Sequence, residues 1–199
     1  MIICGQDLLD LVNTKVIEKV TDDLINAGSI DITCGPNYII EPRQEYKLFE
    51  ITSMPVVDLL AKSSAQVLKL PDEGFCLLPG QCILLESEQI FNLPDGNNSD
   101  EYSPLLSRKC AIFAEYKLKS TMARNFVDAF NAGWCDAGWH GARLTIELRN
   151  CNDDRMIRIK SGDRIGQMIF YQGTTYIPEK YSYKQKGRYN NTSIVTGSR

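Results

Sequence analysis

The chain has 199 residues, of which 43% are hydrophobic and 24% are charged, and its formal net charge at pH 7 is -3. This length and composition are those of one globular domain, residues 1–199, that is long enough to bury a core. The acidic balance argues against a general nucleic-acid coat, because such proteins carry a basic surplus that neutralises phosphates. An anionic ligand must therefore be held by local cations.

The sequence offers no sign of a membrane or secretory protein. No apolar run is long enough to span a bilayer, and the first residues lack the basic and apolar regions of a signal peptide. The seven cysteines are scattered and odd in number, which favours reduced thiols over a disulfide framework. We therefore expect a cytoplasmic protein with no membrane partner.

The elements predicted along the chain are mostly short strands. Residues 6–20 carry the pattern of a short amphipathic helix, although β-branched residues weaken its end. Residues 54–70 fit a helix or an irregular segment, and residues 95–100, DGNNSD, are expected to form a polar turn. The predicted strands are residues 29–33, 46–52, 82–87, 111–117, 142–149, 156–159 and 167–171. Several short strands at this spacing predict a β-barrel or sandwich.

Residues 119–150 are the most informative segment. They begin with Lys119, Ser120 and Thr121, a cation and two hydroxyls at a predicted helix start, where unpaired N–H groups favour an anion. Arg124 lies four residues after Ser120, so both face the same side of one helical turn. A plain helix cap is the alternative interpretation of the Ser-Thr pair.

The segment ends in an alternating strand, LTIELR, at residues 144–149. Its apolar residues share one face, and Thr145, Glu147 and Arg149 share the other. A solvated strand face is the alternative interpretation of these polar residues. The strand would thus carry one carboxylate, Glu147, on the face that does not enter the core.

Between these two elements lies the loop AGWCDAGWHG, residues 132–141. Its three glycines permit close backbone approach to a ligand, and its two tryptophans are costly to leave exposed. Asp136, at its centre, either binds a ligand or caps the turn. We expect Trp134 and Trp139 to pack at a subunit interface rather than to stack on a base. Together the three parts predict a nucleotide site.

The segment resembles the dCTP deaminases of the trimeric dUTPase-like superfamily, because KSTMAR, NAGWCDAGWHG and LTIEL follow the order of that family's motifs. Further likenesses are GSIDI at 28–32, LPGQ at 78–81, FNLP at 91–94, SGDRIGQMIF at 161–170, RY at 188–189 and GSR at 197–199. The resemblance implies a mainly β, distorted β-barrel or jelly roll with a few short helices. It also implies a homotrimer with inter-subunit sites, in which residues 178–199 form a C-terminal lid.

By this resemblance, Glu147 is the general base that takes a proton from water and delivers it to the leaving amino group. Ser120 and Arg124 position that water. The resemblance assigns substrate binding to Lys119, Thr121, Ala123, Ala132, Asp136, Thr145, Ile146, Tyr181, Arg188 and Thr192. A solvated tail is the alternative for Tyr181 and Arg188.

The resemblance also implies which metals take part. Zinc deaminases use a histidine and closely spaced cysteines, whereas this chain has His140 as its single histidine and no C-x-x-C sequence. The hydroxide must then come from a general base in a desolvated pocket. We expect Mg²⁺ to arrive with the nucleotide triphosphate and His140 to be a loop residue rather than a catalyst.

Two length differences set the chain apart from the family pattern. The chain is one residue shorter between Arg124 and Asp136 and one residue longer between Asp136 and Glu147. We expect residues 130–131 and 140–142 to absorb these offsets, or the strand to bulge at Arg143, since a shift inside a strand reverses side-chain direction. Asn131 and Thr192 stand where the family usually has Thr and Gln.

The primary functional prediction is hydrolytic deamination of dCTP to dUTP and ammonia, without zinc. A bifunctional enzyme that continues to dUMP and diphosphate is the first alternative. A dUTPase-like diphosphohydrolase and a non-catalytic nucleotide-binding homologue are the others. The expected partner is dCTP in each deaminase case, with no nucleic acid.

Overall fold

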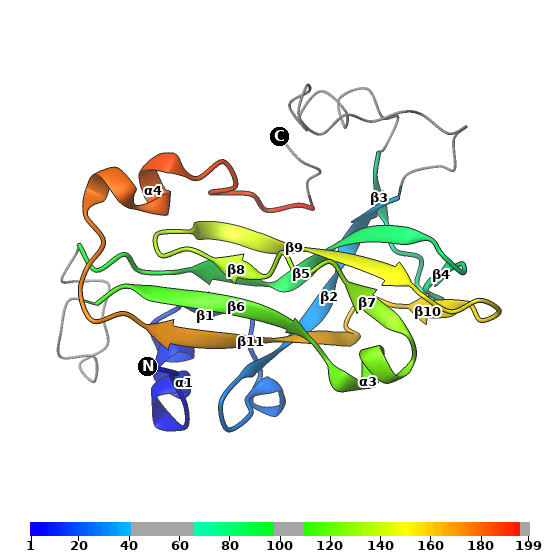
Figure 1. Ribbon diagram of the computed structural model, residues 1–199, viewed down its shortest axis with the longest axis horizontal. Coiled ribbons are helices and arrows are strands. Elements are labelled where there is room, and N and C mark those ends of the chain that lie inside the picture. The colour runs from blue at the N-terminus through cyan, green and yellow to red at the C-terminus, as the bar shows by residue number, and fades with distance from the viewer. Residues whose placement is uncertain (41–65, 98–109, 196–199) are drawn as a thin grey trace.

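The computed structural model describes residues 1–40, 66–97 and 110–195 (Figure 1). The helices are α1 (Gln6–Asn13), α3 (Ser120–Arg124) and α4 (Tyr183–Lys186), with 3-10 turns η1 (Asp22–Leu24) and η3 (Glu179–Tyr181). The strands are β1 (Ile17–Glu18), β2 (Ile30–Ile39), β3 (Val67–Lys69), β4 (Phe75–Leu77), β5 (Cys82–Asn92), β6 (Ile112–Leu118), β7 (Val127–Ala129), β8 (Trp134–Cys135), β9 (His140–Asn150), β10 (Ile157–Ile159) and β11 (Arg164–Gln172). None of the helices in the described ranges has the length and apolar character to cross a bilayer.

Nine of the strands form one curled sheet in the order β7-β9-β5-β2-β11-β6-β8, with β1 on β5 and β3 on β2. The strands β8 and β9 stand near opposite ends of this order, yet only residues 136–139 connect them. Because so short a connection cannot cross a flat sheet, the sheet bends back on itself. The fold is therefore mainly β with a few short helices, as predicted. Strands β4 and β10 form a separate pair.

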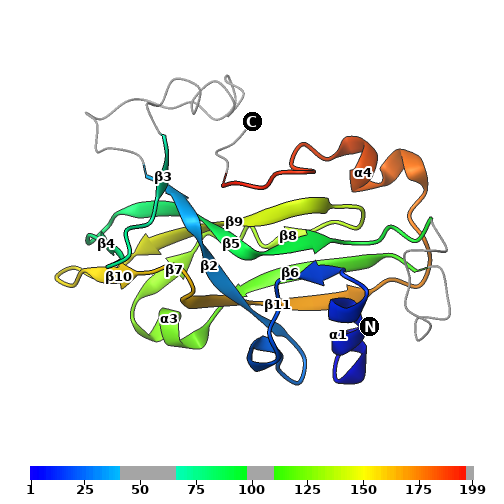
Figure 2. The ribbon, with the colours of Figure 1, turned by 180° about the vertical axis from the view of Figure 1, so that it is seen from behind.

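The core fills the inside of the curl. Along β9, burial alternates so that Leu144, Ile146 and Leu148 are buried while Thr145 and Glu147 are half-buried, as the sequence pattern predicts. From the face seen in Figure 2, α1 and β1 close one side of the sheet. The buried side chains thus fix β9 against the core, and the opposite face of this strand carries Thr145 and Glu147.

The pairing of β5 with β9 is interrupted at two points. Between the pairs Glu86↔Thr145 and Ile90↔Arg143, β5 has two more residues than β9, so its backbone bulges opposite Arg143. The Ser87 hydroxyl fills the gap, because it accepts a hydrogen bond from the Leu144 N–H at 2.9 Å. The sequence had predicted a bulge at Arg143, and the structure places it on the partner strand.

The second interruption lies at Gly141, where β9 has one extra residue between its pairings with Phe91 and Asn92. Gly141 has φ +62°, and a Cβ there would come within 2.5 Å of the Asn191 side-chain oxygen. Only glycine fits this left-handed, crowded position without strain. Residues 140–142 were predicted to absorb an offset, and this irregularity lies among them.

The predicted helix at 6–20 is too long. α1 ends at Asn13, Lys15 takes φ +59°, and Ile17–Glu18 forms strand β1 instead. The β-branched residues Val16 and Ile17 are buried, so tertiary packing decides their conformation.

Six predicted strands are present, and most of them extend further than predicted. Strand β2 continues through Gly35 and Pro36 to Ile39, although these residues are usual strand breakers. The interpretation of 54–70 as helical or irregular is wrong at Val67–Lys69, which forms β3. Residues 54–65 of that segment, the predicted strand 46–52 and residues 98–100 lie outside the described residues.

Replacing Phe91 by Ala should lower the free energy of unfolding by about 3–5 kcal/mol, because the ring is fully buried and stacks on Trp139 with centroids 5.2 Å apart. Urea titration followed by circular dichroism measures this loss. The matched control is Phe126→Ala, since Phe126 is exposed and its loss should change stability by less than about 0.5 kcal/mol. Equal effects of the two substitutions would contradict this account of the core.

Candidate functional site

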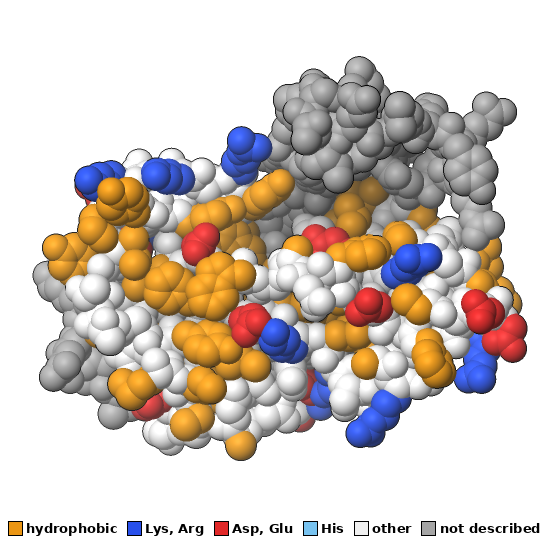
Figure 3. All heavy atoms as spheres, viewed as in Figure 1, with side chains coloured by type: hydrophobic (Ala, Val, Ile, Leu, Met, Phe, Trp, Pro, Cys, Tyr) orange, Lys and Arg blue, Asp and Glu red, His pale blue; other side chains and the backbone are white. Residues whose placement is uncertain are grey.

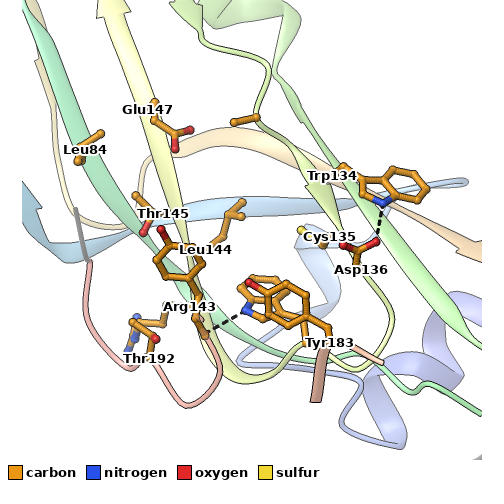
Figure 4. Close-up of a pocket in the computed structure, with 13 residues that line it drawn as sticks. Leu84, Trp134, Cys135, Asp136, Arg143, Leu144, Thr145, Glu147, Tyr183 and Thr192 are labelled. Atoms are coloured by element: carbon orange, nitrogen blue, oxygen red, sulfur yellow. Dashed lines mark hydrogen bonds between the residues drawn. The ribbon is translucent and has the colours of Figure 1, made fainter. Parts of the chain in front are cut away.

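A pocket of about 510 Å³ lies where the turn after β8, strand β9 and the C-terminal tail meet (Figure 4). Strand β9 contributes Arg143, Thr145 and Glu147 to its wall. The turn contributes Asp136, and the tail contributes Thr192. The curl of the sheet therefore brings residues from three separate parts of the chain around one cavity.

Glu147 is the half-buried carboxyl of this pocket. It projects from β9 into the cavity because its neighbours in the strand, Ile146 and Leu148, point into the core. Burial raises the pKa of the Glu147 carboxyl above its ordinary value. A carboxylate with a raised pKa accepts a proton from water more readily than an exposed one does, so Glu147 is suited to general-base chemistry.

Asp136 lies across the pocket from Glu147 (Figure 4). Its Oδ1 accepts a hydrogen bond from the Trp134 indole N–H at 3.0 Å, which fixes the direction of the carboxylate. Trp134 stacks on Phe113 and also meets the ring of Tyr171. Trp134, held by its contacts with Phe113 and Tyr171, thus orients the Asp136 carboxylate in the wall of the pocket.

Arg143 is the cation of the pocket wall. Its Nη1 donates to the Ser87 carbonyl at 2.7 Å, to the Glu88 carbonyl at 3.1 Å and to the Glu88 carboxylate at 3.2 Å. The guanidinium therefore occupies the bulge of β5, and its charge is shared with Glu86 at 3.9 Å. Arg143 connects this bulge to the cavity.

The C-terminal tail runs back past β9 as far as Val195, the last residue described (Figure 1), and its residues Tyr183, Tyr189 and Thr192 line the pocket. The Asn191 N–H donates to the His140 carbonyl, and the Arg143 N–H donates to the Thr192 carbonyl, both at 2.9 Å. Nearer its start, the Trp139 indole N–H donates to the Tyr189 carbonyl at 3.2 Å. These bonds place the tail along the beginning of β9.

Five of the predicted site residues line the pocket together. They are Ala132, Asp136, Thr145, Glu147 and Thr192. Their positions are spread over sixty residues of sequence from 132 to 192, so only the fold explains their proximity. They provide two carboxyl groups and two hydroxyls around the cavity.

The predicted phosphate turn lies elsewhere in this chain. Ser120, Thr121, Ala123 and Arg124 are exposed on α3 and are not among the residues that line the pocket. Lys119 precedes them, and its ammonium is paired with the carboxylate of Asp31. A single chain therefore does not bring this turn to Glu147.

Three other predicted residues also fall outside the pocket. The Ile146 side chain is buried in the core, so its backbone alone can reach a substrate. Tyr181 is 60% exposed and lies beneath the ammonium groups of Lys180 and Lys186. Arg188 is exposed as well.

The sequence prediction missed the tyrosines that do line the pocket, Tyr183 and Tyr189. Burial raises the pKa of the Tyr183 hydroxyl, which favours its neutral, hydrogen-bonding form. The tail contains several tyrosines in a polar context, and no pattern in it separates Tyr183 from Tyr181. The docking of the tail on β9 brings Tyr183 to the pocket and leaves Tyr181 exposed.

Trp139 differs from the expectation that both tryptophans pack at a subunit interface, whereas for Trp134 that expectation stays a prediction. Trp139 is buried within its own chain against Phe91, so it belongs to the subunit core. Trp134 is 56% exposed. Figure 3 shows hydrophobic side chains gathered over β8, β6 and β11, the strands that carry Trp134, Phe113 and Tyr171. His140 begins β9, where its Nδ1 lies 2.9 Å from the Gly138 carbonyl.

The described residues include no group of three or more His, Cys, Asp or Glu side chains arranged to hold a metal ion. The two carboxyl groups of the pocket, Asp136 and Glu147, stand on different sides of the cavity.

Solved structures define the class of fold. The structure is similar to the crystal structure of 2′-deoxycytidine 5′-triphosphate deaminase from Agrobacterium tumefaciens, with a TM-score of 0.61 and 17% identity over 86% of this chain. This chain covers 48% of that one. The curled sheet thus has the fold of that structure.

The sequence comparison defines the family. The chain belongs to the dCTP deaminase-like family, whose profile matches residues 2–173. A protein of Methanoregula boonei is 34% identical over 92% of this chain and 87% of its own length, and one of Methanosphaerula palustris is 28% identical over 100% and 95%. One of Persephonella marina is 26% identical over 100% and 97%. All three are named "dCTP deaminase, dUMP-forming", so the family prediction is confirmed.

Replacing Glu147 by Gln should make the protein more stable at pH 8 than the wild type. The raised pKa means that the folded state holds the Glu147 proton more tightly than the unfolded state does. The stability from this group is complete at acid pH, below the unfolded pKa of about 4.3, and is lost as pH rises through the folded pKa. Glutamine cannot ionise and keeps its stability at pH 8.

The measurement is the difference in melting temperature between Glu147→Gln and wild type, taken at pH 8 and again at pH 5. We expect the larger gain at pH 8. Glu73→Gln is the control, because Glu73 is an exposed turn residue far from the pocket lining. A gain that is the same at both pH values would contradict the assignment of Glu147 as a desolvated carboxyl.

Proposed function

We propose that the protein is a bifunctional dCTP deaminase that converts dCTP to dUMP, ammonia and diphosphate. The observation that carries the proposal is Glu147, a desolvated carboxyl with a raised pKa inside a pocket of about 510 Å³. Family membership supports dCTP as the substrate. The names of the relatives favour dUMP over the dUTP that the sequence predicted as the primary product.

In the proposed deamination, Glu147 removes a proton from a water molecule while the oxygen of that water attacks C4 of the cytosine ring. The C4–N bond then breaks, the amino group leaves as ammonia with the proton that Glu147 returns, and the second proton of the water moves from the new C4 hydroxyl to N3 to give the uracil ring. The apolar wall of the pocket, including Leu84 and Leu144, excludes bulk water and keeps the carboxyl desolvated. Asp136, oriented by Trp134, is placed to accept a hydrogen bond from the deoxyribose hydroxyl.

In the proposed second reaction, another water attacks the α-phosphorus, and diphosphate leaves. The sum is one dCTP and two waters giving dUMP, ammonia and diphosphate. Mg²⁺ bound to the triphosphate would neutralise charge on the leaving group. Residues of this chain would then need to bind the nucleotide, and the triphosphate would supply most of the ligands of the ion.

We further propose that a second copy of the chain completes each site, as in the homotrimer implied by the resemblance. Ser120 and Arg124 belong to the predicted site but lie on α3, outside the pocket of their own chain. The exposed aromatic surface around Trp134 offers an apolar face for contact between copies (Figure 3). A neighbouring α3 would supply Ser120 and Arg124, which do not line the pocket of their own chain.

Anion-exchange chromatography of a reaction with dCTP and Mg²⁺, together with an ammonia assay, tests the proposed chemistry. We expect dUMP, diphosphate and ammonia in equal amounts without accumulation of dUTP, and no ammonia from Glu147→Gln. Glu73→Gln should retain full activity because Glu73 lies outside the pocket. The rate should also fall on the acid side at a pH above the ordinary glutamate pKa, because protonated Glu147 cannot act as a base.

The other outcomes of this assay distinguish the alternatives. Accumulated dUTP with ammonia would indicate a deaminase that stops at dUTP. Diphosphate from dUTP without ammonia from dCTP would indicate a dUTPase-like enzyme. Binding of dCTP without any product would indicate a non-catalytic homologue, and each of these results would overturn the proposed conversion to dUMP.

Co-expression of two inactive variants, Glu147→Gln and Arg124→Ala, tests the shared site. If Glu147 and Arg124 of different copies meet, random assembly should restore about a quarter of the wild-type sites, because half of the chains supply each intact residue. Co-expression of Glu147→Gln with Glu147→Ala is the control and should restore none. A mixture of folded but inactive chains with no recovery would contradict sharing between subunits.

A further inference from the structure

Glu86 is a buried carboxylate that the proposed chemistry does not use. Its side chain is 1% exposed on β5, beneath the bulge that holds Arg143. One carboxylate oxygen accepts from the Asn37 side-chain amide at 2.7 Å, and the other accepts from the backbone N–H of Val195 at 2.8 Å. A Cβ at Gly35 would lie 2.7 Å from the Glu86 Cγ, so glycine leaves the space that this side chain occupies.

The bond from Val195 attaches the tail to the sheet. Val195 is itself only 1% exposed, although it lies near the end of a polar tail. Three residues earlier, the Thr192 carbonyl accepts from the Arg143 N–H. The tail is thus held at two adjacent points, Glu86 and Arg143, and these two side chains are themselves an ion pair at 3.9 Å.

The same contacts connect the tail to the pocket. Arg143 and Thr192 both line the cavity, and Tyr189 lines it a few residues before. Strand β9 and this part of the tail each form part of the wall of the pocket (Figure 4). The position of the tail therefore determines the shape of the cavity.

A buried carboxylate suits a contact that must open. Burial of a charge has a large desolvation cost, which hydrogen bonds and the nearby guanidinium offset. When the tail leaves, the Glu86 carboxylate becomes accessible to water and regains hydration. The net contribution of the bond to Val195 is therefore modest, and the tail can be released without unfolding the sheet.

We propose that Glu86 is a positioning residue that latches the C-terminal tail over the pocket, with Arg143 linking the latch to the cavity wall. The latch rests on the proposed function in one respect, that dCTP occupies this pocket. In the closed state it holds Thr192 and Tyr189 against the cavity and excludes bulk water. In the open state it lets the nucleotide pass.

Amide hydrogen exchange, measured by mass spectrometry on peptides that cover residues 187–195, tests the latch without any need for activity. In Glu86→Ala, exchange in this segment should become roughly ten- to a hundredfold faster, the effect of losing one hydrogen bond to a charged group. Glu86→Gln should restore much of the protection, because its amide oxygen still accepts from Val195. Glu88→Ala is the matched control, since Glu88 contacts Arg143 but not the tail, and its exchange should equal that of wild type.

Steady-state kinetics with dCTP provides the second measurement. We expect Glu86→Ala to raise KM about tenfold and to lower kcat less, because the latch mainly determines how the nucleotide is held. If Glu86→Ala does not fold, Val195→Pro removes the same hydrogen-bond donor and leaves the carboxylate in place.

If amide exchange in residues 187–195 is as slow in Glu86→Ala and Val195→Pro as in the wild type, Glu86 does not latch the tail. Faster tail exchange with unchanged KM and kcat would overturn its positioning role. A wild-type protein that releases no ammonia from dCTP would refute the proposed function, whereas the exchange measurement would still decide whether Glu86 holds the tail.

Discussion

The short connection between β8 and β9 is the constraint on which the rest of the structure depends. Strand β8 ends the sheet on β6, whereas β9 pairs with β5 and β7 near its other end. Residues 136–139 join them, and Trp139 stacks on Phe91 to fix the connection in the core. This closure brings Asp136 to one side of a cavity and Glu147 to the other. It also creates the groove along which the tail docks.

Desolvation of Glu147 follows from the same closure. The strand pattern places its neighbours in the core, and the turn, the tail and β5 cover the cavity into which its carboxyl projects. Apolar surface excludes water from the carboxyl. This desolvation disfavours the charged form, so the pKa of Glu147 rises. Ionisation of a carboxyl in such a desolvated position lowers the stability of the folded state.

The extra residue on β9 and the bulge on β5 illustrate how a strand absorbs irregularity near a site. Gly141 takes the left-handed conformation, and Arg143 fills the space opened on the partner strand. Past these points the alternation of β9 is intact, so Glu147 keeps its orientation toward the cavity. The irregular part of the strand is also where the tail binds, through the His140 carbonyl and the Arg143 N–H. Departures from regular pairing thus leave backbone groups free for the tail.

The sequence by itself determined the strand-rich class, the family and the alternation that turns Glu147 away from the core, because these depend on local periodicity and on short ordered motifs. It did not determine that Tyr183 rather than Tyr181 lines the pocket, that Lys119 pairs with Asp31, or that Glu86 holds Val195. The last two contacts join residues 88 and 109 positions apart, which no local pattern encodes. Tertiary structure decided them, because the curl of the sheet and the docking of the tail select which side chains are desolvated together.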